Sequence, residues 1–532
     1  MRAIKKVFLA VALALLASVL FIGLRWFTGL GSMPLALAAE APALAGTVAA
    51  PPFPEGLAWI NTGGRPVTLR ELRGKVVLLD FWTYGCINCF HILPGLDRLQ
   101  KTYGNDLVII GVHSAKFATE RKTAHIEAIV LRYGIDHPVV NDKNMQIWNE
   151  YGAEGWPTLT VIDPAGNVVG QVSGEGHYAL LNQVIGTLIR EFAARGEINS
   201  KPLWFSGIRL QMPKTTLLFP GKVLADPAHD RLFIADSNHN RIVVTTLAGK
   251  VLAVIGDGTA GLRDGSYTEA EFRYPQGMTL AGADTLYVAD TDNNAIRRVN
   301  LKTRRVVTVA GDGRQTYMTD PVMPARTAKL NTPWAVLFHG GLLYIAMAGQ
   351  HQLWVYDPAQ KIIRLYAGSG EEGIRDGALL SASFAQSSGL ATDGRELYVA
   401  DPEASAVREV GFGAGARVHT LVGTGLFDFG DRDGVGREVL LQHDLGIAWH
   451  AGHLYIADTY NSRIRVLNPK TRRVTTLAGG RGEFDEPGGL SVAGNELYVA
   501  DTDHNRVAVV DLKTGKISTL KLSDPAHLLA RP

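Results

Sequence analysis

The feature that most constrains the fold is a five-residue phrase that recurs along the second half of the chain. It consists of leucine, an aromatic residue, valine or isoleucine, alanine and, in five of six copies, aspartate. The copies begin at Leu232, Leu286, Leu343, Leu397, Leu454 and Leu497, 43 to 57 residues apart. Each phrase is a predicted strand, with one further predicted strand before it and two after it. Six repeats of four strands predict an all-β, six-bladed propeller over residues 218–532.

The fullest form of the phrase is Tyr-Val-Ala-Asp-Thr-x-x-Asn, at residues 287–294. In this form the repeat resembles the NHL repeat, and the resemblance covers the whole of residues 218–532. The third copy departs from it, because Met347 stands where the other copies have aspartate. We therefore expect any turn hydrogen bond made by that aspartate to be missing in the third blade.

The recurring aspartates are interpreted as turn residues, because an aspartate side chain readily accepts hydrogen bonds from turn N–H groups. The same interpretation applies to a recurring Gly-x-x-Asp-Gly, at residues 261–265, 373–377 and 430–434. Calcium binding is the alternative for these loops. It is disfavoured because each loop offers fewer carboxylates than an oxygen cage needs.

Two further hypotheses concern the centre of the propeller. Some NHL propellers are zinc lyases, and the candidate ligands here, His339, His443 and His504, share no repeated placement, so we expect no catalytic metal. Residues beside the innermost strands vary between blades, as they would on a binding face. The candidate binding face is Gln276, Trp334, Ser388, Asp444 and Glu486. Drift within the repeat explains the same variation equally well.

The only two cysteines of the chain, Cys86 and Cys89, lie in a C-x-x-C spacing. They follow an apolar run at 76–79 that predicts a strand, and they precede residues 90–101, which are apolar at helical intervals. A thiolate at the start of a helix is stabilised by unsatisfied N–H groups and by the helix dipole. The arrangement predicts a redox-active pair. A structural disulfide is the alternative, but closing so short a loop stabilises a fold little.

Strands and helices alternate around this pair. Strands are predicted at 107–112 and 159–162, the latter paired with 168–172, and helices at 119–133, 145–151 and 178–194. Such alternation predicts a layered α/β domain over residues 55–195.

Three motifs in this domain, Asp80-Phe81-Trp82, the C-x-x-C and Trp156-Pro157-Thr158, give it a family resemblance. The domain resembles the thioredoxin-like fold, nearest to the exported thiol-disulfide oxidoreductases related to TlpA and ResA. The resemblance implies that Cys86 is the exposed attacking thiol and Cys89 the resolving thiol. It also implies that Asp80 is a buried proton acceptor for the resolving thiol; a strand-end polar residue without a catalytic part is the alternative.

The same resemblance implies a cis peptide bond before Pro157, placed against the disulfide. That bond would present Trp156 and Thr158 to a client chain, and Trp82 is a further candidate for client contact. His91 follows the pair closely and is interpreted as a surface residue of the helix; perturbation of a thiol is the alternative.

Some residues depart from the family pattern. Gly85 precedes the pair where many relatives have tryptophan, and Ile87-Asn88 lies between the thiols where thioredoxin has Gly-Pro. These residues tune the reduction potential, and the direction of electron flow stays open. Thr83 to Cys86 also spells the T-x-x-C of peroxiredoxins. Peroxidase activity is disfavoured, because Leu79 stands where that family has proline.

The first residues predict export. Arg2, Lys5 and Lys6 precede an uncharged run at 7–24, which indicates a signal anchor in the membrane or a signal peptide cut after Ala38. Either would place the rest of the chain on the periplasmic side of a bacterial inner membrane. The predicted domains are 1–48, signal segment and tether; 55–195, thioredoxin-like; 196–217, linker; and 218–532, propeller.

Charge excludes one class of partner, since 53 Lys and Arg against 51 Asp and Glu leave no nucleic-acid footprint. The domain combination resembles the thioredoxin-like NHL-repeat proteins of bacteria and animals. We expect a thiol-disulfide oxidoreductase with no cofactor beyond the Cys86–Cys89 disulfide, whose propeller docks or positions a protein partner. Because no third cysteine exists, a client and an external redox partner must supply the other thiols. The alternative is a non-catalytic scaffold in which both domains dock partners.

Overall fold

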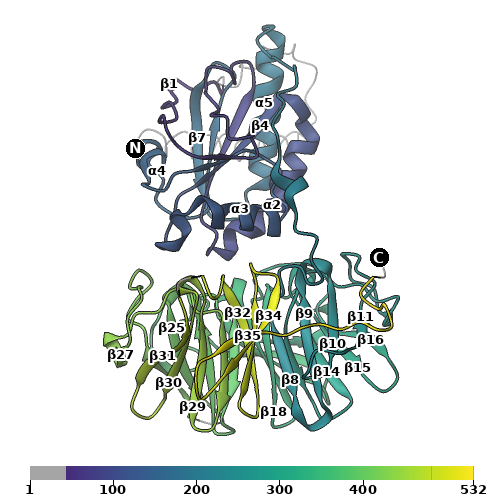
Figure 1. Cartoon of the computed structure of the whole chain (residues 1–532). Coiled ribbons are helices and arrows are strands. Elements are labelled where there is room, and N and C mark those ends of the chain that lie inside the picture. Colours follow the sequence, from purple (N-terminus) through teal and green to yellow (C-terminus); the bar gives the residue numbers. More distant parts are fainter. Residues whose placement is uncertain (1–43, 414, 481, 531–532) are drawn as a thin grey trace, which may run out of the picture. The chain divides into compact units, whose positions relative to one another are not determined.

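The computed structural model describes residues 44–413, 415–480 and 482–530 (Figure 1). Contacts divide the chain into two compact units, one ending at Met212 and the other beginning at Pro213. The predicted export segment at 7–24 and its candidate cleavage site lie outside the described residues. Within the residues that are described, no helix is both long enough and apolar enough to span a membrane.

The first unit is built on one mixed sheet of seven strands, in the order β1-β7-β6-β3-β4-β5-β2. Strands β3, β4 and β5 are parallel, and the other neighbours are antiparallel. The strands are β1 Val48–Ala49, β2 Trp59–Ile60, β3 Val76–Trp82, β4 Leu107–His113, β5 Val139–Asn141, β6 Thr158–Ile162 and β7 Asn167–Ser173. This topology confirms the predicted α/β layering around the cysteine pair.

Helices cover both faces of this sheet. They are α2 Ile87–Tyr103, α3 Thr123–Arg132, α4 Gln146–Tyr151 and α5 Tyr178–Ala194. Alternate side chains of β3 point to opposite faces: Val76 and Leu78 pack with α2 and α5, whereas Val77 and Leu79 pack with α4. Because both faces are covered, β3 and β4 are buried along their whole length, which explains their continuous apolar runs.

One predicted helix is interrupted. The segment 119–133 forms a short 3₁₀ turn, Thr119–Arg121, followed by α3, and Lys122 between them is extended. Because of this break, Glu120 belongs to the 3₁₀ turn and not to α3.

The predicted linker, residues 196–217, is not a single connecting segment, because part of it packs on the first unit. Leu203 and Phe205 pack against the core of the first unit. The buried ammonium of Lys75 donates to three carbonyl oxygens, those of Asn105 at 2.6 Å and of Asn199 and Lys201 at 2.7 Å. Burial of the Lys75 ammonium lowers its pKa. Because of these contacts, residues 199–205 are part of the first unit.

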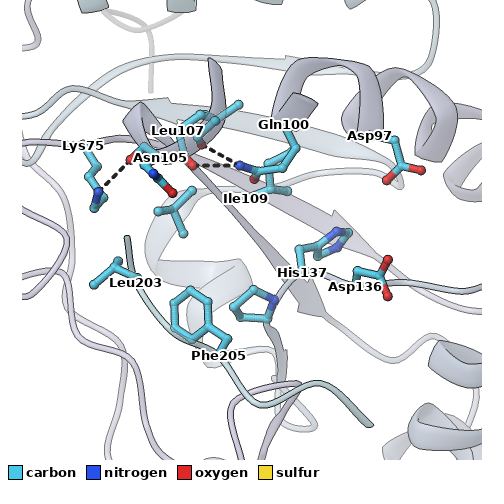
Figure 2. A pocket seen from close by; sticks show the side chains of 13 residues that line it. Lys75, Asp97, Gln100, Asn105, Leu107, Ile109, Asp136, His137, Leu203 and Phe205 are labelled. Atoms are coloured by element: carbon cyan, nitrogen blue, oxygen red, sulfur yellow. Dashed lines mark hydrogen bonds between the residues drawn. The ribbon is translucent and has the colours of Figure 1, made fainter. Parts of the chain in front are cut away.

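A cavity of about 200 Å³ lies beneath this segment (Figure 2). Its lining includes Leu203, Phe205, His137, Gln100 and Leu107. Neither cysteine contributes to it, so the cavity is separate from the dithiol.

The second unit contains six antiparallel sheets, which confirms the predicted six blades. The innermost strands are β8 Val223–Asp226, β13 Pro275–Leu280, β18 Pro333–His339, β23 Gly389–Thr392, β28 Gly446–His450 and β32 Pro487–Ala493. The second strands hold the repeated phrase: β9 Arg231–Asp236, β14 Thr285–Asp290, β19 Leu342–Met347, β24 Glu396–Asp401, β29 His453–Asp458 and β33 Glu496–Asp501.

Two or three outer strands complete each blade. The third strands are β10 Arg241–Thr245, β15 Ala295–Asn300, β20 Gln352–Asp357, β25 Ala406–Gly411, β30 Arg463–Asn468 and β34 Arg506–Asp511. The fourth are β11 Val251–Ile255, β16 Arg305–Ala310, β21 Ile362–Ala367, β26 Arg417–Val422, β31 Arg473–Gly479 and β35 Ile517–Thr519. Four blades add a short edge strand: β12 Gly265–Ser266, β17 Val322–Pro324, β22 Gly377–Ala378 and β27 Gly434–Val435.

The C-terminal segment returns to the first blade. Val251 donates its backbone N–H to Ser523 at 2.8 Å, and Ser523 donates to Gly249 at 3.0 Å. In Figure 1 the yellow end of the chain crosses toward β11. Leu528 and Leu529 pack on the core shared by the first and last blades, so this segment helps to close the ring.

The repeated aspartate anchors five of the six blades by hydrogen bonds, as the turn interpretation predicts. In the second blade Asp290 is buried and accepts from the backbone of Arg273 at 2.8 Å and from the side chain of Asn293 at 2.9 Å. It also accepts from Arg297, seven residues onward, at 2.7 Å. Arg297 in turn reaches Asp264 of the Gly-x-x-Asp-Gly loop at 3.0 Å. The loop aspartate is therefore an ion-pair partner of the arginine.

The same double pairing recurs in the fourth blade, through Asp401, Arg408 and Asp376. It recurs again in the fifth, through Asp458, Arg465 and Asp433. In the third blade the two buried positions hold Met347 and Trp354 instead. The expected loss of the aspartate bond there is accompanied by loss of its arginine partner.

Candidate active site

The cysteine pair lies at the junction of β3 and α2. Beyond Trp82 the chain turns through Thr83, Tyr84 and Gly85, and the backbone N–H of Cys86 donates to the carbonyl of Thr83 at 3.2 Å. Cys86 is the residue that precedes α2, in an extended conformation and without a side-chain cap bond. The first N–H groups of α2 therefore lie beside the thiols, where they favour negative charge.

The two thiols have different environments. Both are present as free thiols; Cys86 is 8% exposed and Cys89 1%. The Cys86 thiol faces the carbonyl oxygen of Trp156, with Sγ and O 3.8 Å apart. Burial raises the pKa of Cys89 well above its usual value, and the neighbouring Cys86 and Asp80 add to the increase. Cys86 is therefore the accessible thiol of the pair, although far less exposed than the family resemblance implies.

Asp80 lies in the middle of the sheet, on β3. It is 1% exposed, and its Oδ1 has no hydrogen-bond partner among the described residues. Burial raises the pKa of Asp80 to about 8, so near neutral pH this carboxyl holds a proton. The fraction of this carboxyl that is ionised near neutral pH lies within electrostatic reach of Cys89 and has the properties of a proton acceptor.

The peptide bond between Trp156 and Pro157 is cis, as the resemblance implies. The bond immediately precedes β6, whose first residue pairs with Phe81 of β3. Trp156 is half-buried, donates its indole N–H to the carbonyl of Ser114 at 2.9 Å and packs on Trp148 at a centroid distance of 4.7 Å. Its carbonyl is thereby held against Cys86.

Three neighbouring side chains that the sequence predicts to be exposed or to contact a client are buried in the structure. Thr158 is fully buried and donates to the carbonyl of Gly155 at 2.7 Å, so its side chain faces the interior and not a client. Trp82 is 2% exposed, because it lies at the end of the central strand beneath α2. His91 is no surface residue: its side chain is 8% exposed and lies 2.9 Å from Glu175.

Two further residues, which sequence reasoning missed, belong to the site. Glu120 is fully buried and accepts hydrogen bonds from the turn that precedes Cys86. Burial raises the pKa of Glu120, and those hydrogen bonds oppose the increase. In the sequence it resembles an ordinary polar residue of a helix, and no motif marks it.

The second is His113, the last residue of β4. Its ring stacks on Tyr84 at 5.4 Å and meets Trp82 edge-on at 4.9 Å. Burial lowers the pKa of His113 to about 3. His113 is therefore a neutral wall of the site. Its only sequence signal is its place at a strand end.

The structure does not place the candidate binding residues of the propeller on an exposed face. Four of them, Gln276, Ser388, Asp444 and Glu486, are at most 2% exposed, and only Trp334 is half-buried. The reason is that they lie where the innermost strands begin and neighbouring blades converge. Gln276, for example, donates to Ser237 at 3.1 Å, and Ser388 to the carbonyl of Leu445 at 3.0 Å.

The three candidate zinc ligands also have other contacts. His339 stacks on Phe412, His443 stacks on Tyr460, and His504 lies 2.9 Å from Asp501. Among the described residues, no group of three or more His, Cys, Asp or Glu side chains is arranged to hold a metal ion.

A thioredoxin-like unit with a C-x-x-C pair, followed by an NHL-type propeller, defines a two-domain class of protein. Comparisons with known proteins agree with this description. A thioredoxin-like family model matches residues 74–168, and an NHL repeat model matches residues 484–510. Over 112 residues, 21% of this chain, the sequence is 32% identical to the thiol-disulfide oxidoreductase ResA of Bacillus anthracis and covers 62% of that protein.

Longer matches cover both units. NHL repeat-containing protein 2 of Homo sapiens is 40% identical over 489 residues, which are 84% of this chain and 67% of that protein. The chain belongs to the family of NHL repeat-containing protein 2. The chloroplastic protein SUPPRESSOR OF QUENCHING 1 of Arabidopsis thaliana is 42% identical over 478 residues, but the match spans only 45% of that protein.

Proposed function

We propose that this protein is a thiol-disulfide oxidoreductase that uses Cys86 and Cys89, with the propeller as its protein-binding or positioning module. The observation that carries the proposal is the asymmetry of the pair. Cys86 retains access at the head of α2, whereas Cys89 is buried within electrostatic reach of a proton acceptor, Asp80. The similarity of the first unit to ResA supports the same chemistry.

The reaction, written as reduction of a client, has two steps. The Cys86 thiolate attacks a client disulfide, an S–S bond forms between Cys86 and the client, and the second client sulfur leaves as a thiolate that takes up a proton. Cys89 then gives its proton to the ionised form of Asp80 and attacks Cys86. The first client sulfur leaves as a thiolate that takes up a proton, and Asp80 releases its proton to solvent. The client gains two electrons, and the pair is oxidised to a disulfide. An external dithiol reductant restores the pair, and oxidation of a client follows the same steps in reverse.

The test uses the full chain with insulin as a disulfide substrate and dithiothreitol as reductant. We expect Cys86→Ser to reduce the rate to that of dithiothreitol alone. The matched variant Cys89→Ser keeps the attacking thiol, so it should accumulate a mixed disulfide through Cys86, detectable by mass spectrometry. Wild-type protein no faster than Cys86→Ser would refute the proposal.

The exported location predicted from residues 2–24 remains part of this proposal. It fits a disulfide cycle, because disulfides persist in oxidising compartments. A cysteine-free reporter fused after residue 48 would locate the chain by protease protection, and a cytoplasmic reporter would contradict this part.

A second candidate is a scaffold that docks partners without redox chemistry. The observation that favours it is the small exposure of Cys86 together with the burial of Trp82 and Thr158 beside it. It predicts that the double variant Cys86→Ser/Cys89→Ser retains every partner of the wild type. Loss of partners from the double variant would exclude it.

A further inference from the structure

Glu120 makes an unusual set of contacts for a buried carboxylate. Its Oε1 accepts the backbone N–H of Gly85 at 2.8 Å. Its Oε2 accepts the hydroxyl of Thr83 and the backbone N–H groups of Lys116 and Phe117, the latter two at 2.8 and 2.9 Å. Four donors therefore converge on one side chain that is 0% exposed.

These bonds join two segments that are far apart in the sequence. One is the turn Thr83–Gly85, which leads directly into Cys86; the other is the loop after β4. Gly85 is the residue before Cys86, and the carbonyl of Thr83 accepts the backbone N–H of Cys86 at 3.2 Å. Both residues that fix the backbone of the attacking cysteine are thus bonded to Glu120.

Among the described residues, the N–H of Gly85 donates only to Glu120, so loss of the carboxylate would leave a buried donor unsatisfied. A buried backbone donor without a partner is unfavourable, and the turn would shift to find one. A shift of this turn moves Cys86 relative to both Cys89 and the carbonyl of Trp156.

If Glu120 only stabilised the fold, other buried carboxylates would have the same role. The first unit contains a second buried carboxylate that allows this comparison. Asp163 is 1% exposed and accepts the backbone N–H groups of Asn167 at 2.8 Å and of Gly46 at 2.9 Å. It follows Ile162, which pairs with Val77 near the start of β3, whereas Cys86 follows the end of that strand. A strand of this length separates the two positions by about 20 Å.

We propose that Glu120 is a positioning residue for the Cys86–Cys89 couple: its carboxylate fixes the Thr83–Gly85 turn and thereby holds the two sulfurs ready to join. This inference rests on the proposed function. Holding two reacting groups in place raises their effective concentration, so a fixed turn favours the disulfide over the dithiol. Loosening the turn should shift the equilibrium toward the dithiol.

The experiment equilibrates the full chain with glutathione redox buffers and measures the dithiol and disulfide forms by mass spectrometry after alkylation. We expect Glu120→Gln to lower the equilibrium constant for disulfide formation about tenfold, or about 30 mV. The amide keeps the size of the side chain but cannot accept four hydrogen bonds. Thr83→Val should cause a shift in the same direction, and Thr83→Ser, which keeps the hydroxyl, should stay within threefold of the wild type.

Asp163→Asn is the matched control. It removes a buried carboxylate with backbone donors, so it should lower the melting temperature and leave the equilibrium constant unchanged. The inference fails if Glu120→Gln and Thr83→Val have the wild-type constant, or if Asp163→Asn shifts it equally. Should Glu120→Gln not fold, Thr83→Val against Thr83→Ser decides alone. A wild type with no reversible couple would instead overturn the proposed function.

Discussion

Buried carboxylates of the two units differ in their hydrogen-bond partners and in their pKa values. Asp290 of the propeller has an arginine, a backbone N–H and an asparagine as partners, and its pKa is raised by burial to only about 6. Asp80 of the first unit is equally buried, has one oxygen without a hydrogen-bond partner in the described part of the chain, and has a pKa raised to about 8. The hydrogen-bond and ion-pair partners of Asp290 make it a structural residue. Asp80 has an oxygen without such a partner in the described structure and is available for proton transfer.

The third blade shows that the architectural role does not require charge. Met347 and Trp354 occupy the positions of the aspartate and arginine, and both are buried within an apolar core. Replacing a buried ion pair by well-packed apolar residues is often neutral for stability, whereas removing one partner is costly. At these two positions the blades therefore contain either a buried ion pair or a pair of apolar side chains.

Asp444 qualifies the comparison. It is buried in the propeller, and burial raises its pKa well above the usual value. The charge of Lys222, whose ammonium donates to the carbonyls of Leu445 and Gly488, opposes this increase. A lone buried carboxylate therefore does not define a redox site by itself. The neighbouring thiols distinguish Asp80.

The largest effect should come from separating a buried ion pair. Arg297→Met leaves Asp290 buried without its cation, and such changes typically cost about 3–5 kcal/mol of folding free energy. We expect the urea midpoint of the propeller to fall accordingly. The double variant Asp290→Met/Arg297→Trp copies the third blade and should recover at least half of the loss. A cost below about 1 kcal/mol for the single variant would contradict the architectural role.

The next effect concerns Asp80 and pH. Its folded pKa of about 8 exceeds the unfolded value of about 3.9, so the folded state binds the extra proton between these values. The contribution of Asp80 to stability is therefore greatest below pH 4 and is lost as pH rises toward 8, by up to about 1.4 kcal/mol per pH unit.

Asp80→Asn has no proton to lose. Relative to the reduced wild type, its stability should improve between pH 5 and pH 8 by up to about 4 kcal/mol. Hydrogen exchange of β3, corrected for the intrinsic rate at each pH, measures the difference. A difference that does not change with pH would show that Asp80 is ionised throughout.

The smallest effect should come from the outer partner of the same arginine. Asp264 is 43% exposed in its side chain, so water screens its attraction to Arg297. Asp264→Asn keeps an oxygen to accept from the backbone of Thr308 and should cost about 1 kcal/mol or less. A loss as large as that of Arg297→Met would mean that the exposed bond, and not the buried one, closes the blade.

Much of this organisation could be predicted because its signals are local. The six-fold phrase, the C-x-x-C after an apolar strand and the Trp156-Pro157 step are all patterns of spacing within short segments. Contacts between distant segments could not be predicted in the same way. Glu120 lies 37 residues from Thr83 in the sequence, and the two meet only because β3 and β4 are neighbours in the sheet.

Burial was the other property that spacing did not reveal. Variation among Gln276, Ser388 and their counterparts suggested a surface, yet these side chains lie where the inner strands converge. The seven-residue interval from Asp290 to Arg297 was present in the sequence as a repeat. It acquired meaning only when the structure showed the two side chains in contact.

The most direct test of the account is the redox equilibrium of the full-length wild type in glutathione buffers at pH 7, measured as free Cys86 and Cys89 after alkylation. The account predicts one two-electron transition between a dithiol and an intramolecular disulfide that joins these residues. Thiols that stay free at every potential, or that form only separate glutathione adducts, would contradict it.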